Sequence, residues 1–146
     1  MAEEKIADIM RDFVKVMAEG DVEKTLSFFT EDAEYTCPMG SFSGTQEIKR
    51  FMTVQSSMME DAKVTESGNG IIVDGNKAFF EHVISGSYQG KRTEVLAMCA
   101  YEFEDDKIKK VRSAFDRLLM AKQAAPGWFA KTMVNFIINK METGLH

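Results

Sequence analysis

Three side chains in this 146-residue sequence have the types and positions that proton transfer needs, and His82 is the first of them. It lies in the β-prone run "KAFFEHVISG", next to Glu81. Because neighbouring strand residues face opposite sides of a sheet, only one of these two can point inward. If it is His82, it shares a face with Phe80 and Ile84 and is the best general base near neutral pH. A histidine with a purely structural hydrogen bond is the alternative.

Asp116 and Tyr35 are the other two candidates. Asp116 is flanked by apolar residues in "FDRLL", and such a carboxylate is a candidate general acid or base if it lies in a cavity. The alternative is an exposed carboxylate paired with Arg112 or Arg117. Tyr35 precedes Cys37 by two residues in "AEYTC", so both share one strand face, and the hydroxyl can face a ligand oxygen. A core tyrosine is the alternative.

The composition restricts the partners and the compartment. A net charge of −5, without a run of like charges, argues against nucleic acid or an anionic membrane as partner. The charged N-terminus does not resemble a secretory signal, and no stretch approaches about 18 uninterrupted apolar residues. The two cysteines fit free thiols in a reducing compartment. We therefore expect a cytoplasmic protein that does not bind membranes.

Neither a metal nor an organic cofactor is expected. The sequence has two histidines, His82 and His146, and no paired Cys or His at ligand spacing. The glycines of "SGNGIIVDGN" precede a strand rather than a helix, so they do not form a phosphate-binding loop. "SFSGT" has no plausible histidine and acid for a catalytic triad.

The elements that must position these residues are helices first and strands afterwards. Apolar spacing predicts a helix that ends at Gly20, and Asp21 then caps a short helix over "VEKTLSFF". A strand follows over "AEYTC", and Thr45 caps a third helix. From about residue 62, alternating apolar residues predict four antiparallel strands with turns at Asp74-Gly75, Gln89-Gly90 and Asp105-Asp106.

A last helix begins at Pro126 and is apolar over more than half of its circumference. We expect one side of it on the sheet and the other against a partner subunit or the pocket mouth, which favours a homodimer. The length favours a single domain over residues 1–146.

This order of elements resembles the nuclear transport factor 2-like superfamily, whose members are cone-shaped α+β half-barrels around an apolar cavity. The segment "AEGDVEKTLSFFTEDAEYTCPMGSFSGTQEIKRFM" is similar to ketosteroid isomerases and SnoaL-like polyketide cyclases. The resemblance implies a curved antiparallel sheet packed on N-terminal helices. It also implies a small apolar partner in the cavity, and we expect the lining to include Phe13, Met17, Cys37, Met52, Phe80, Cys99 and Tyr101.

The resemblance implies different chemistry in its two branches. Alignment through "GD", "CPMG" and "YEF" puts the isomerase base at Cys37, its protonated aspartate at Cys99 and its tyrosine at Phe13, so ordinary ketosteroid isomerase chemistry is not implied. The SnoaL-like cyclases are similar at "FDRLLMAKQ", which implies that Asp116 and Gln123 act as acid and base.

Three functions remain open from the sequence. The first is a cofactor-independent isomerase, cyclase or dehydratase that moves a proton on a small apolar carbonyl compound. The second is a noncatalytic protein that binds small hydrophobic ligands. The third is a dimeric interaction module.

Overall fold

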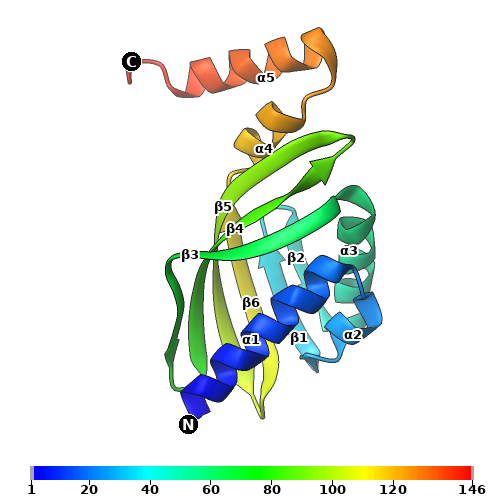
Figure 1. Cartoon of the computed structure of the whole chain (residues 1–146), viewed down its shortest axis with the longest axis vertical. Coiled ribbons are helices and arrows are strands. Elements are labelled where there is room, and N and C mark those ends of the chain that lie inside the picture. Colours follow the sequence, from blue (N-terminus) through cyan, green and yellow to red (C-terminus); the bar gives the residue numbers. More distant parts are fainter. Residues whose placement is uncertain (1, 146) are drawn as a thin grey trace.

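The computed structural model describes residues 2–145, and this part of the chain contains five helices and six strands (Figure 1). The helices are α1 (Ala2–Glu19), α2 (Val22–Leu26), α3 (Gly44–Met58), α4 (Arg117–Ala124) and α5 (Gly127–Met141). The strands are β1 (Phe29–Cys37), β2 (Gly40–Ser43), β3 (Glu60–Asp74), β4 (Lys77–Tyr88), β5 (Lys91–Glu104) and β6 (Lys107–Phe115).

The strands form one curved sheet in the order β2-β1-β6-β5-β4-β3. The predicted antiparallel meander is confirmed for β3 to β6, but β1 joins β6 in parallel, so the sheet is mixed. Two hairpins have positive φ at both central residues, Gln89 with Gly90 and Asp105 with Asp106. This backbone matches the twist of the flanking strands, which explains why these turn signals located the hairpins correctly.

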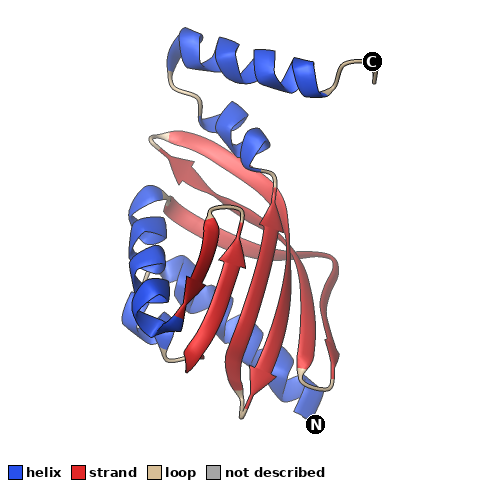
Figure 2. Cartoon of the chain, turned by 180° about the vertical axis from the view of Figure 1, so that it is seen from behind, coloured by secondary structure: helices blue, strands red, loops and turns tan. Residues whose placement is uncertain are grey.

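Alternation in β5 separates the two faces of the sheet. Val95, Ala97 and Cys99 are buried on the concave face, whereas Leu96 and Met98 are exposed on the convex face. Helices α1 and α3 cover the concave face, and Figure 2 shows the convex face without a covering helix. The expected cone-shaped α+β architecture is therefore observed.

An aromatic cluster fills the inside of the sheet under α1. Phe13 is 1% exposed, and its ring makes edge contacts with Phe28, Phe29 and Tyr101 at centroid distances of 5.8, 5.4 and 6.2 Å. Such pairs add to the stabilisation from burial alone. Because these rings pack against one another, the space beneath them is closed.

The N-terminal half differs from the sequence expectation in three places. Helix α2 stops at Leu26, since Phe29 begins a strand that pairs with Ile108 of β6. A short strand, β2, follows the turn after Cys37 and was not expected. Helix α3 begins at Gly44 with Ser43 rather than Thr45 at its N-cap.

The C-terminal half departs further. Strand β6 ends at Phe115, and a separate helix that the sequence analysis did not predict, α4, follows it. Helix α5 begins after Pro126 as predicted, but none of its residues is buried, so it does not lie on its own sheet. None of the helices in residues 2–145 is both long and apolar enough to span a membrane.

Candidate functional site

A half-open pocket of about 1030 Å³ lies between the concave face of the sheet and helices α1, α3 and α4. This volume is at the upper end of the range for small-molecule sites, about 300–1,000 Å³. Most of the lining is apolar, and it includes Val14, Met17, Phe51, Met52, Phe80, Phe115 and Met120.

Charged side chains lie at the solvent-exposed part of the lining. Arg11 Nε lies 2.8 Å from Glu66 Oε1 and joins α1 to β3 there. Arg117 donates to the carbonyl oxygen of Pro38 at 3.1 Å. These charged groups are exposed to solvent. They can interact with a charged part of a ligand at the pocket mouth but not in the interior.

Tyr35 is the polar side chain that stands out in the apolar interior. It is buried, lines the pocket, and its ring packs against Phe51 at a centroid distance of 5.1 Å. Burial raises the pKa of Tyr35 far above its usual value, and the nearby thiols of Cys99 and Cys37 raise it further. Its hydroxyl has no hydrogen-bond partner among the described residues. Tyr35 is therefore a neutral donor with its proton available.

The hydroxyl of Ser113 also lines the pocket, and a chain of hydrogen bonds connects it to the core. Tyr101 donates to the sulfur of Cys99, and Cys99 Sγ donates to Ser113 Oγ at 3.2 Å. Burial raises the pKa of both Tyr101 and Cys99, so both stay neutral. Ser113 lines the pocket and retains its own proton for a ligand. Sequence reasoning missed Ser113, although a polar residue between Val111 and Phe115 on an inward strand face was a usable signal.

The expected pocket lining divides into two groups. Met17, Cys37, Met52 and Phe80 line the pocket. The structure corrects the placement of Phe13, Cys99 and Tyr101, which lie in the packed core and do not line the pocket. The aromatic cluster closes that end of the cone, so the residues beneath it contact protein rather than open space.

His82 faces the concave side but is not part of the pocket lining. It is 3% exposed, and its ring stacks on Phe80 at a centroid distance of 4.3 Å. Nδ1 lies 3.3 Å from the carbonyl oxygen of Phe80. Burial lowers the pKa of His82, and the hydrogen bond to Phe80 offsets this only in part, so the imidazole is neutral at neutral pH. Phe80 and Ile84, on the same face, do line the pocket.

Asp116 and Gln123 have structural contacts outside the pocket. The exposed Asp116 is the N-cap of α4, where Oδ1 accepts a hydrogen bond from the Leu119 amide at 2.8 Å. The side-chain amide of Gln123 bonds both the N–H and the carbonyl of Glu94, at 2.8 and 2.9 Å. Because the chain turns into a helix at Asp116, the carboxylate points to the helix end, which corrects the expectation of a cavity acid. Neither side chain lines the pocket.

No group of three His, Cys, Asp or Glu side chains gathers at metal-binding distance within residues 2–145. The buried and half-buried polar groups that line the pocket are hydroxyls, the thiol of Cys37 and the side-chain amide of Gln55. They are suited to hydrogen bonding with a ligand.

The curved sheet, the helices on its concave face and the half-open pocket define a nuclear transport factor 2-like fold. A sequence profile described as a SnoaL-like domain matches residues 10–111, and the chain belongs to this family. The profile ends before Ser113, α4 and α5, so these features lie outside the matched region.

Solved structures share the fold at low sequence identity. One is a hypothetical protein with a ketosteroid isomerase-like fold from Catenulispora acidiphila, in complex with trimethylamine (15% identity, TM-score 0.74, 82% of this chain and 93% of that chain). Another is a putative isomerase from Bacillus subtilis (18%, TM-score 0.72, 83% and 92%). A third is an epoxide hydrolase of M. tuberculosis (14%, TM-score 0.73, 94% and 98%). At these identities the likeness shows the fold alone.

The N-cap role of Asp116 predicts how two substitutions differ. Asp116→Ala removes the acceptor for the Leu119 amide and should lower the free energy of unfolding by about 1 kcal/mol. Asp116→Asn keeps a capping oxygen and should cost much less. Urea unfolding followed by circular dichroism measures both, and an equal loss for the two variants would contradict the cap assignment.

The buried neutral His82 predicts a pH dependence of stability. Its native pKa lies below the usual histidine value of about 6.5, so the unfolded chain binds more protons than the native protein as the pH falls through 6.5. The free energy of unfolding should therefore decrease from pH 6.5 downward, until the native pKa is passed. Urea titrations at several pH values measure this, and His82→Gln should flatten the slope in that window. A native pKa above 6.5, seen by NMR in a His146→Gln background, would contradict the assignment.

Proposed function

We propose that the protein binds a small, largely apolar molecule that carries an oxygen acceptor such as a carbonyl, and that Tyr35 donates the hydrogen bond that orients it. The unpartnered hydroxyl of Tyr35 inside an apolar pocket carries this proposal. The hydroxyl is reached from the pocket, so a ligand acceptor can pair with it there, and a neutral hydrogen bond of this kind contributes about 0.5–1.5 kcal/mol.

The surrounding groups make this preference specific. Apolar side chains of α1, α3 and the sheet surround the ligand space, and burying a ligand's apolar surface against them supplies binding free energy. Ser113 supplies a second neutral donor, because its oxygen already accepts from Cys99. Two neutral donors favour a neutral oxygen over a carboxylate, which would bring an uncompensated charge into the pocket.

The wider setting is consistent with a small-molecule partner. One fold neighbour is in complex with a small molecule, trimethylamine. The net charge of −5 gives no attraction to a phosphate backbone. We also propose a cytoplasmic location, which is supported by the two buried free cysteines, Cys37 and Cys99.

Two probes that differ only in the carbonyl test the binding proposal. 2-Acetylnaphthalene has the oxygen, and 2-ethylnaphthalene lacks it. Tyr35→Phe should weaken the ketone roughly 2- to 10-fold, the effect of one neutral hydrogen bond, and leave the hydrocarbon unchanged. Calorimetric titration measures the affinities, and the infrared carbonyl stretch of the bound ketone should shift to higher frequency in the variant.

Tyr88→Phe is the matched control, since Tyr88 also lines the pocket but is only half-buried. It should leave both affinities unchanged. If the ketone does not bind the wild-type protein, or if Tyr35→Phe weakens both probes equally, the proposed orientation by Tyr35 is wrong.

A second candidate function is catalysis of proton transfer on the bound carbonyl compound. The buried, neutral imidazole of His82 favours it, because a neutral base on the concave face can take a proton from carbon. Tyr35 would then donate to the oxygen of the resulting enolate, and the proton would return to carbon from His82. The transfer requires the imidazole edge to become accessible beside Phe80, on which it stacks.

Deuterium exchange at carbon tests this second function. In D₂O, the protein should accelerate exchange of the α-hydrogens of 2-tetralone over buffer, as followed by proton NMR. His82→Gln should remove about a hundredfold or more of this acceleration, while Asp116→Asn should leave it unchanged. Binding of the ketone without exchange would identify a noncatalytic binding protein.

A further inference from the structure

Helix α5 has a large apolar surface that its own chain leaves uncovered. Its half-buried residues Ala130, Val134 and Ile138 lie on one side, and α4 is the element with which it mainly packs. The exposed apolar surface of this helix is here called the outer face of α5. It consists of Trp128, Phe129, Met133, Phe136, Ile137 and Met141.

The outer face has the spacing and size of a surface that is buried in a complex. Phe129, Met133, Phe136 and Ile137 recur at the intervals of an amphipathic helix that packs against another element. Trp128, Phe129 and Phe136 are 80%, 70% and 64% exposed. Since aromatic side chains present about 150–250 Å² each, these three alone expose roughly 400 Å². Contiguous apolar patches above a few hundred Å² mark interaction sites.

The convex face of the sheet has a second uncovered apolar surface. Ile72, Phe79, Leu96 and Met98 are 51%, 36%, 48% and 40% exposed, and together they are called the convex patch. The register places these residues near one another: Ile72 pairs with Phe79, and Phe79 pairs with Ala100, which makes Met98 its diagonal neighbour on the same face. Glu81 pairs with Met98, but its carboxylate turns away to accept the Asn69 amide at 3.0 Å.

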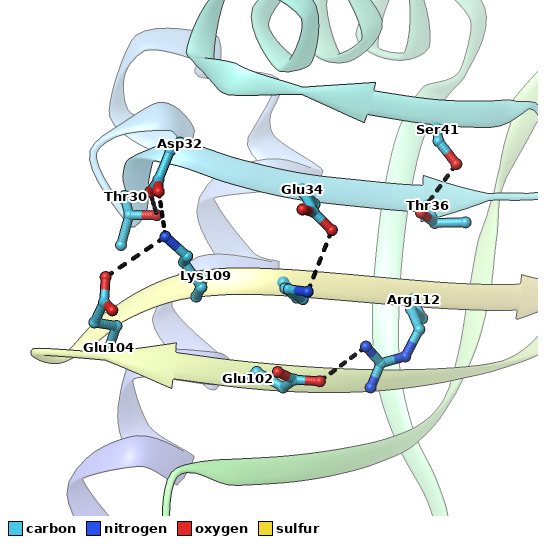
Figure 3. A network of polar contacts seen from close by, with 10 residues as sticks. Thr30, Asp32, Glu34, Thr36, Ser41, Glu102, Glu104, Lys109 and Arg112 are labelled. Carbon is cyan, nitrogen blue, oxygen red and sulfur yellow. Dashed lines mark hydrogen bonds and ion pairs between the residues drawn. The ribbon is translucent and has the colours of Figure 1, made fainter.

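The other half of the convex face is polar, which limits the patch. On β1, β6 and β5 the outward side chains form ion pairs, as Figure 3 shows. Arg112 Nη1 lies 2.9 Å from Glu102 Oε1, Lys110 pairs with Glu34 at 3.5 Å, and Lys109 pairs with Asp32. Charges that pair with one another in water gain little from being covered. The apolar half over β3, β4 and β5 is therefore the part of this face that favours a partner.

We propose that the protein is a two-fold dimer in which the outer face of α5 of each copy packs on the convex patch of the other copy. Each chain carries both surfaces, so a two-fold axis that places α5 of one copy on the convex patch of the other forms the same contact twice. Helix α5 stands off its own sheet beyond α4, with the convex face bare beside it (Figures 1 and 2).

The dimensions and areas agree with this arrangement. A 15-residue helix is about 22 Å long, and the patch crosses three strands at about 5 Å spacing and extends over several residues of each. Each copy contributes one outer face and one convex patch. These are sufficient for the roughly 800 Å² per partner that a stable interface buries.

Charge favours a second copy over a membrane. Helix α5 contains Lys131 and Lys140 and no acidic residue, whereas the chain as a whole has a net charge of −5. Glu94 lies on the convex side of β5, two residues from Leu96 of the patch, where it attracts the lysines of the partner helix. The net negative charge of the chain repels an anionic bilayer. Burial of the aromatic residues of α5 against the sheet of another copy is therefore favoured over insertion into such a bilayer.

Sedimentation velocity on the full chain tests the dimer. The wild-type protein should sediment at twice its 16.5 kDa monomer mass. Phe136→Asp, on the outer face, should raise the dissociation constant about 30-fold or more, as the loss of a central aromatic anchor does. Val54→Asp is the matched control, because Val54 is 50% exposed on α3 outside both surfaces, and it should change nothing. Far-UV circular dichroism verifies that both variants are folded.

Disulfide cross-linking tests the pairing of the two surfaces. A mixture of Met98→Cys and Met133→Cys proteins should form a mixed disulfide dimer under mild oxidation. Wild type, whose cysteines are buried, and a mixture of Val54→Cys with Met133→Cys should not. The proposal is overturned by a wild-type monomer at all concentrations or by a dimer that Phe136→Asp leaves intact. It is equally overturned by a cross-link that closes within a monomeric Met98→Cys/Met133→Cys chain, or by a monomer that sediments with phosphatidylglycerol vesicles. None of these readouts depends on ligand binding in the pocket.

Discussion

Packing of α1 onto the concave face of the sheet is the interaction on which the rest of the structure depends. Alternate residues of β5 and the apolar stripe of α1 are buried together, with Met10 and Phe13 at the contact. Because the sheet curves, one helix cannot fill the whole concavity. Aromatic rings close the space around Phe13, and the part bounded by α3 and α4 remains open as the pocket. Core and site are thus two outcomes of the same curvature.

Desolvation determines what chemistry this pocket can support. Tyr35 in the pocket wall and Cys99 and Tyr101 in the core behind it are buried, and burial holds all three in their neutral, proton-bearing forms. Such groups stabilise a ligand oxygen without carrying charge, which is the electrostatic part of carbonyl chemistry. A base is a separate requirement, and His82 is a neutral imidazole on the same sheet face. The distinction between binding and catalysis therefore depends on one side chain and its access beside Phe80.

The two faces of the sheet have different roles. The concave face builds the core and the pocket, whereas the convex face has an ion-paired half and an apolar half. The protein's own helices leave the apolar half uncovered, and α5 presents an apolar surface that its own chain does not bury. A helix that leaves its own domain has little packing to hold it in place. In the proposed dimer, a second copy of the chain supplies the surface that covers it.

The sequence by itself determined the features that depend on local periodicity and turn chemistry. It predicted α1, the hairpins from β3 to β6, the start of α5 and the α+β architecture. Tertiary contacts decided the rest. Phe29 became a strand residue through its pairing with Ile108, Asp116 became an N-cap because β6 ends at Phe115, and α5 left the sheet. Which concave residues line the pocket was likewise decided by ring packing around Phe13, since periodicity assigns a face but not the distance between opposite walls.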